Sequence, residues 1–152
     1  MTSEPSSVLA LGSDHAGLQL KNHLAHWLTA QGFSFKDFGV FNADSMDYPD
    51  IAKPVAEAVS QGDFSRGILV CGSGIGINIS ANKVTGIRAA QCHDPVSARL
   101  SRQHNNANIL TLGERIVTPL LAEEIVSVWL NTPFEGGRHQ RRVDKIHDLE
   151  SL

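Results

Sequence analysis

The stretch Gly67-Ile68-Leu69-Val70-Cys71, followed at once by Gly72-Ser73-Gly74-Ile75-Gly76, decides the fold. The first five residues form a short apolar run of the kind that is typical of a buried strand. Three glycines at alternate positions then allow the backbone to turn sharply and to pass close to a ligand. The stretch therefore predicts a buried strand, a tight glycine-rich turn and a helix in direct succession.

The same alternation of strand and helix patterns continues on both sides of this stretch. Strands are expected over 8–12, 33–38, 67–71, 86–92 and 108–112, and helices over 18–28, 51–59, 77–82, 95–104, 120–130 and 138–149. Parallel strands need connections of helix length, so this alternation predicts an α/β, Rossmann-like three-layer fold. We expect a five-stranded parallel sheet with helices on both faces. Polar and glycine-rich segments follow the strands, where ligands bind in open α/β sheets.

Composition narrows the class of protein. A chain of 152 residues with 41% hydrophobic residues predicts one folded domain over 8–152, preceded by a frayed polar tail over 1–7. The net charge of −3 argues against a nucleic-acid partner, which needs a broad basic surface. No apolar run approaches the roughly 18 residues of a membrane span, and the N-terminus does not resemble a signal peptide. With two cysteines and no disulfide framework, a cytoplasmic protein is expected.

The glycine-rich turn is the first candidate for chemistry. The N–H groups at the start of the following helix would form an anion site, although a plain strand-to-helix turn would look the same. A dinucleotide fingerprint is a further alternative, because Asp94 ends the next strand. Against that alternative, the third glycine comes one residue early, and the chain has no room for a separate substrate domain.

Cys71 is the second candidate, as the last residue of the predicted strand. It lies beside a helix N-terminus, whose dipole would favour a thiolate. Such a thiolate could act as a nucleophile or as the base for a carbon acid. Alternatively, Cys71 is a small buried hydrophobic residue, as most free cysteines are. Cys92 has no comparable setting, and we expect it to be structural.

Basic residues form a third candidate site. Arg138 and Arg142 lie four residues apart on one face of the last helix, where two guanidinium groups could grip a phosphate. A solvated helix face with partners such as Asp144 is the alternative. Arg115, just after the fifth strand, is a further candidate phosphate ligand.

Histidines supply the remaining candidates. His104, in Ser101–Asn106, ends a helix and could be a general acid or base. His15 follows Asp14 at the end of the first strand and has the same ambiguity: a surface histidine is the alternative in both cases. The seven histidines are scattered without metal-ligand spacing, so no metal is expected.

Taken together, these residues resemble type B ribose-5-phosphate isomerases, in the wider group that includes galactose- and allose-6-phosphate isomerases. The resemblance extends from about residue 8 to residue 149. It rests on these motifs, in this order: Gly12–Gly17, Asp47–Pro49, Cys71–Gly76, Ser80–Lys83, Gly86–Ala89, Ser101–Asn105, Gly113–Arg115 and Glu135–His139.

The resemblance implies an aldose–ketose isomerase without cofactor or metal. It would interconvert D-ribose 5-phosphate and D-ribulose 5-phosphate through a cis-enediolate, in the non-oxidative pentose phosphate pathway. By the same resemblance, Cys71 is the base that moves a proton between C2 and C1, and His104 opens the furanose ring. The implied substrate contacts are Asp14, His15, Tyr48, Gly72, Ser73, Gly74, Ile75, Gly76 and Asn105. The implied phosphate ligands are Arg115, Arg138, Arg142 and His15.

The resemblance also implies a homodimer, or a tetramer of two dimers, whose active sites are shared between subunits. The Cys71 half of each site and the His104/arginine half would then come from different chains, with the helix at about 138–149 contributing to the dimer and the phosphate site. Some relatives carry a glutamate in the glycine loop instead of the cysteine; here that position is Ile77, which places the chain on the cysteine branch. Two functional alternatives stay open: an isomerase of a six-carbon phosphosugar (allose or galactose 6-phosphate), and a non-catalytic phosphosugar-binding module.

Overall fold

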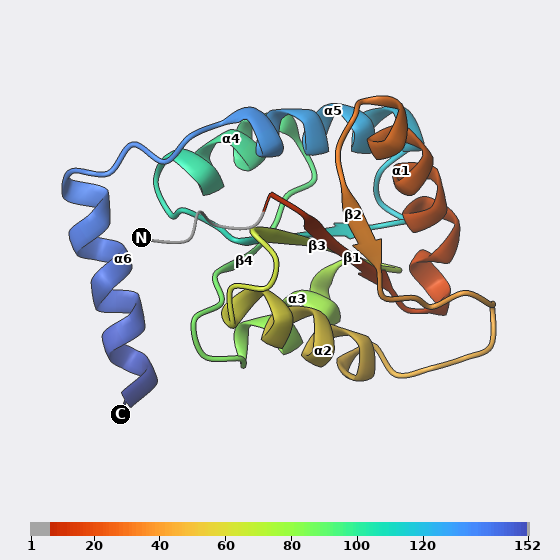
Figure 1. The fold of residues 1–152 in the computed structure, drawn as a ribbon, viewed down its shortest axis with the longest axis horizontal. Coiled ribbons are helices and arrows are strands. Elements are labelled where there is room, and N and C mark those ends of the chain that lie inside the picture. Colours follow the sequence, from red (N-terminus) through yellow and green to blue (C-terminus); the bar gives the residue numbers. More distant parts are fainter. Residues whose placement is uncertain (1–6, 152) are drawn as a thin grey trace.

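The computed structural model describes residues 7–151, which form a five-stranded, all-parallel sheet with helices on both faces (Figure 1). The strands are β1 Leu9–Ser13, β2 Phe35–Asp37, β3 Arg66–Cys71, β4 Ala89–Gln91 and β5 Ile109–Gly113, in the order β2-β1-β3-β5-β4. The helices are α1 Leu18–Ala30, α2 Pro49–Ser60, α3 Ile75–Asn82, α4 Pro95–Gln103, α5 Pro119–Asn131 and α6 Arg138–Asp148, with single turns at His15–Gly17 and Leu149–Ser151. The predicted fold class is confirmed. The predicted N-terminal tail lies outside the described residues except for Ser7.

The two edge strands are shorter than the sequence pattern predicts, with three residues each in β2 and β4. Beyond β2 the backbone pairing with β1 continues, since the N–H of Phe38 donates to the carbonyl of Leu11 at 2.8 Å, whereas before β4 a side chain enters the pairing. The N–H of Arg88, just before β4, donates to Oδ1 of Asn108 at 2.8 Å instead of to a neighbouring strand. An edge strand has a neighbour on one side only, so its length depends on such local partners, which periodicity does not report.

Helix α3 begins at Ile75, two residues earlier than predicted. Gly74 precedes it with φ +77°, a left-handed conformation that glycine adopts readily. This single residue turns the chain directly from the glycine loop into the helix. Ile75 and Gly76 therefore belong to the first turn of α3.

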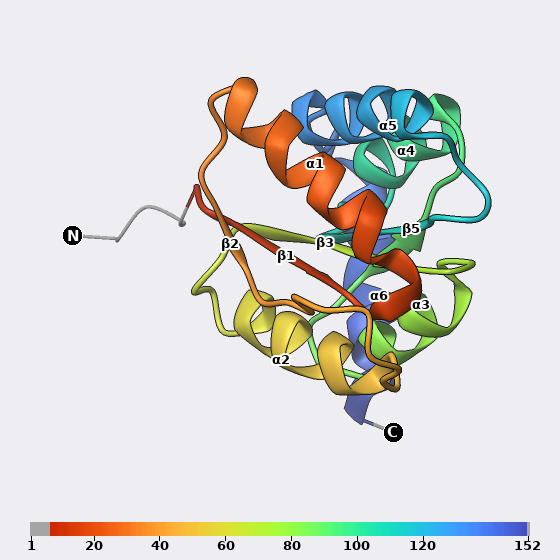
Figure 2. The ribbon, with the colours of Figure 1, turned by 90° about the vertical axis from the view of Figure 1, so that its right-hand side faces the viewer.

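Two apolar cores lie on opposite faces of the sheet. Side chains alternate along each strand, so Leu11, Val70 and Leu112 pack under α1, α4 and α5. Leu69, Cys71 and Ile109 face α2 and α3 instead. Figure 2 shows the two helical layers above and below the sheet. Cys71 thus points to the α2–α3 side.

Helix α6 stands apart from both layers in Figure 1. It is tied to the rest of the chain near each end. The N–H of Glu135, just before α6, donates to the carbonyl of Gln103 at 3.1 Å. Beyond its last turn, Oε1 of Glu150 accepts the N–H of Gly86 at 2.9 Å. Among residues 7–151, no helix has both the length and the apolar character that crossing a membrane requires.

Candidate active site

Cys71 lies at the carboxyl end of β3, next to β1, where the order of the strands reverses and ligands of open α/β sheets bind. Its side chain is almost fully buried. The N–H of Gly74 donates to Sγ of Cys71 at 3.1 Å. A backbone donor thus faces the sulfur, and this geometry suits a cysteine that acts as a base.

The carbonyls of the glycine loop are held from below by two side chains that the sequence pattern did not single out. Nε2 of Gln91, in β4, donates to the carbonyl of Ser73 at 2.8 Å. Oγ1 of Thr111, in β5, lies 3.1 Å from the carbonyl of Gly74. A threonine in the middle of an otherwise apolar strand was the one available signal, and it does not reveal the partner.

Asp14 and His15 follow β1, so they lie at the same carboxyl end of the strands as Cys71. Oδ1 of Asp14 accepts the N–H of Gly17 at 3.0 Å and holds the turn in place. Nδ1 of His15 accepts the N–H of Met46 at 3.1 Å. In the neutral ring the proton is therefore on Nε2, which is left as a donor for a ligand.

Tyr48 packs directly on the glycine loop. A Cβ built on Gly76 would lie 2.4 Å from Cζ of Tyr48, so only glycine lets the ring lie against the start of α3. Tyr48 is 41% exposed and so remains available to a ligand. Tyr48 thus lies against the glycine loop that follows Cys71.

Arg115 belongs to the Cys71 half of the site. A Cβ built on Gly72 would lie 3.3 Å from NH1 of Arg115, which places the guanidinium group against the loop. The N–H of Arg115 also donates to the carbonyl of Gly72 at 3.0 Å. Of the three candidate phosphate arginines, this one lies beside the candidate base.

His104 lies in a different place, at the end of α4. Its ring stacks on that of His139, in the first turn of α6, with centroids 4.3 Å apart and planes 12° apart. Burial lowers the pKa of His139, and the nearby charges of His104 and Arg138 lower it further. A neutral His139 can therefore lie against His104 without repelling a proton held there. Asn105, which is exposed, follows in the same loop.

His104, Glu135 and His139 are also the one group within residues 7–151 that could hold a metal ion, with ligand atoms within 4.8 Å of one another. Two ligands about 2.1 Å from one zinc ion would lie about 3.4 Å apart. The parallel imidazole rings do not direct their in-plane lone pairs at a common point, and Arg138 and Arg142 add positive charge nearby. The donor set therefore fits a metal poorly.

Arg138 and Arg142 are exposed on α6. Within the described range, neither guanidinium group forms a hydrogen bond or an ion pair. Asp144, a candidate partner on the same helix, instead accepts a bond from Nε2 of Gln140 at 2.8 Å. Two unpaired guanidinium groups one helical turn apart suit a dianionic phosphate.

One chain holds these two halves apart. All strands are parallel, so Cys71 and Arg115 lie at the carboxyl edge of the sheet. His104 follows α4, the helix that connects β4 to the amino end of β5. It therefore lies near the opposite, amino-terminal end of the strands. The six residues of β3 alone span about 20 Å. Figure 1 shows α6 beyond the end of the sheet at which β1 begins.

Asp94 decides against the dinucleotide alternative. Its Oδ1 caps α4 by accepting the N–H of Ser97 at 2.6 Å, and this bond is the main cause that lowers its pKa. Moreover, β5 separates β4 from β3, so the acid does not follow the strand adjacent to the glycine loop. The Asp94 carboxylate is therefore the N-cap of α4. Cys92, expected to be structural, is buried, and burial raises the pKa of its thiol.

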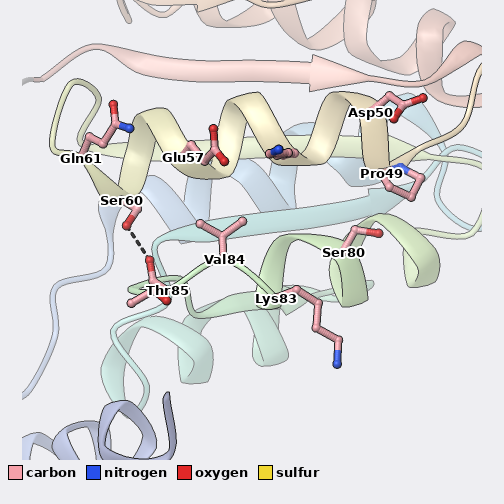
Figure 3. Close-up of a pocket in the computed structure, with 10 residues that line it drawn as sticks. Pro49, Asp50, Glu57, Ser60, Gln61, Ser80, Lys83, Val84 and Thr85 are labelled. Atoms are coloured by element: carbon pink, nitrogen blue, oxygen red, sulfur yellow. Dashed lines mark hydrogen bonds between the residues drawn. The ribbon is translucent and has the colours of Figure 1, made fainter. Parts of the chain in front are cut away.

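A groove of about 660 Å³ lies elsewhere, between α2 and the segment that follows α3 (Figure 3). A hydrogen bond from the Ser60 hydroxyl to the carbonyl of Thr85 closes one end. Lys83 points away from α2. The groove contains none of the predicted site residues.

Comparison with known proteins identifies the family. The family model described as Ribose/Galactose Isomerase matches residues 9–146. Ribose-5-phosphate isomerase B of Escherichia coli is 47% identical over 142 residues, covering 93% of this chain and 95% of that protein. D-erythrulose-4-phosphate isomerase of Pectobacterium atrosepticum is 45% identical, covering 91% of each chain. The structure of Clostridium thermocellum ribose-5-phosphate isomerase B superposes with a TM-score of 0.93 at 51% identity, covering 95% and 97% of the two chains. This chain therefore belongs to the ribose/galactose isomerase family and is an isomerase.

Proposed function

We propose that this isomerase interconverts D-ribose 5-phosphate and D-ribulose 5-phosphate, with Cys71 as the base. The observation that carries the proposal is the Gly74 N–H directed at Sγ of Cys71, beside the Arg115 guanidinium group. Two relatives that cover nearly the whole chain carry the name ribose-5-phosphate isomerase B, which supports this substrate.

The chemistry follows from the residues. The Cys71 thiolate takes the proton from C2 of the linear aldose, and the C1 carbonyl oxygen becomes the oxyanion of a cis-enediolate. Loop N–H groups donate to that oxygen, and such a donor typically contributes about 10²–10³ in rate. The proton of the O2 hydroxyl passes to O1, and the thiol returns its own proton to C1 as O2 becomes the carbonyl, so the base is regenerated. The arginines hold the non-reacting phosphate and position the reacting carbons.

We also propose that two chains share each site. The second half of the site lies near the other end of the strands from Cys71. A second copy of the chain therefore has to bring these residues to Cys71: His104, Asn105, Arg138 and Arg142. Both α3 and α6 leave apolar side chains open for such a contact: Ile75 and Ile79 of α3 are 52% and 55% exposed, and Ile146 of α6 is 41% exposed. A homodimer would bury these faces and complete two sites at once.

Substrate length is the open alternative within the same chemistry. A six-carbon phosphosugar would need a longer distance between Arg138 of the second copy and Cys71. The relative named for D-erythrulose 4-phosphate indicates that the family also handles shorter sugars. A coupled assay with ribose 5-phosphate, allose 6-phosphate and erythrulose 4-phosphate decides between them. We expect the highest kcat/KM with ribose 5-phosphate; a higher value for another of these sugars, or no turnover of ribose 5-phosphate, overturns the proposed substrate.

His104→Ala should impair the ring-closed aldose more than the linear ketose. Erythrulose 4-phosphate is the linear comparison, because the phosphate on O4 prevents furanose closure in this ketose and in its aldose partner. We expect kcat/KM for ribose 5-phosphate to fall by about 10²-fold or more, the usual range for one general acid–base, and that for erythrulose 4-phosphate to fall less. Initial rates with the two substrates measure this difference, and an equal loss in both would argue against ring opening by His104.

A further inference from the structure

We infer that Gln91 is a positioning residue for Cys71: its side-chain amide fixes the Ser73–Gly74 peptide so that the Gly74 N–H faces the sulfur. This inference rests on the proposed function for its catalytic consequence only. Its geometric content is the pair of bonds on one peptide, from Nε2 of Gln91 to the Ser73 carbonyl at 2.8 Å and from the Gly74 N–H to Sγ at 3.1 Å.

Peptide planarity connects these two bonds. In a trans peptide the C=O and the following N–H point in opposite directions. A donor on β4 that holds the Ser73 carbonyl therefore aims the Gly74 N–H the other way, at Cys71 on β3. Rotating the same plane by half a turn would direct the carbonyl oxygen at the sulfur and repel a thiolate.

Gly74 makes such a rotation inexpensive unless something opposes it. Its φ of +77° is accessible because it has no side chain, and glycine also tolerates the negative φ that the rotated peptide would need. A Cβ could not be added to stiffen the position, since it would lie 2.9 Å from the backbone carbon of Leu112. The loop therefore depends on anchors outside itself.

The sheet supplies those anchors from two neighbouring strands. Gln91 of β4 is paired in register with Thr111 of β5, so both side chains project from the same face. That face is the one that carries Leu69 and Cys71. The hydroxyl of Thr111, which is fully buried, lies 3.1 Å from the next carbonyl, that of Gly74, and 3.1 Å from Oδ1 of Asn78. The peptides on both sides of Gly74 are thus fixed, and Gln91 holds the one whose N–H reaches the sulfur.

The test is the pH dependence of Cys71 alkylation by iodoacetamide, followed by mass spectrometry of the Cys71 peptide in the full-length protein. Gln91→Met keeps the length of the side chain and removes the donor; Gln91→Glu replaces the donor with a charged acceptor. We expect the pH midpoint of alkylation to rise in both variants, and more in Gln91→Glu. At a pH below the midpoint, the alkylation rate of each protein is divided by its own rate at the high-pH plateau. This ratio should be about tenfold lower in Gln91→Met than in the wild type, the expected effect of one lost hydrogen bond to a charged group. Isomerase kcat should fall with KM nearly unchanged.

Gln61→Met is the matched control, because Gln61 is an exposed glutamine at the end of α2, and its profile should be that of the wild type. Thermal unfolding identifies any variant that fails to fold, in which case the other Gln91 variant decides. A wild-type alkylation profile in a folded Gln91 variant overturns the inference, even if the chain isomerises ribose 5-phosphate. A shifted profile supports it even if that activity is absent, so the two proposals fail separately.

Discussion

Replacing Cys71 with alanine should lower kcat for ribose 5-phosphate by about 10³-fold or more, within the range expected for the loss of an essential base. No other described side chain combines an ionisable sulfur with an N–H donor at the switch point. Phosphosugar binding should change little, because the phosphate is held by the arginines and the sugar by the loop backbone.

Isothermal titration with ribulose 5-phosphate, beside the coupled assay, separates these two effects. Cys92→Ala is the matched control: it also removes a buried, free cysteine, but one that lies away from the glycine loop. Its kcat should stay close to that of the wild type, whatever it loses in stability. Normal turnover by Cys71→Ala would rule out Cys71 as the base.

Replacing both Arg138 and Arg142 with glutamine should lower kcat/KM by about 10²–10⁴, since each removes a charge-assisted bond to phosphate. Both guanidinium groups are free of partners within residues 7–151, so their loss should leave the fold intact. Most of the effect should appear in KM, because the phosphate takes no part in the proton transfer.

Arg141→Gln provides the control on the same helix, since it also removes an exposed arginine, but one that is not a candidate phosphate ligand. Inhibition by inorganic phosphate should weaken in the double variant and persist in Arg141→Gln. If the double variant keeps a wild-type KM for ribose 5-phosphate, the phosphate binds elsewhere.

Much of the fold could be predicted from the sequence because its signals are local. The apolar run ending at Cys71, the glycines that follow and the helical spacing on either side each depend on residues close together in the chain. Gly74 shows the limit of this reasoning, because its positive φ starts α3 two residues early.

What could not be predicted depends on which strands become neighbours. Periodicity does not reveal that β5 lies between β3 and β4, yet this order carries Asp94 away from the loop and sets Gln91 beside Thr111. Periodicity likewise does not reveal that the three candidate phosphate arginines lie in two separate places. Arg115 lies against Gly72, whereas Arg138 is on a separate helix at the opposite edge.

The most direct test of the account is subunit complementation between Cys71→Ala and His104→Ala. Each variant alone should be nearly inactive on ribose 5-phosphate. When the two are co-expressed with different tags, a mixed dimer should contain one site with both defects and one site with none. Random pairing of equal amounts should then restore about a quarter of wild-type activity, all of it in the fraction that carries both tags. A purified mixed dimer without activity would contradict the shared site on which the account depends.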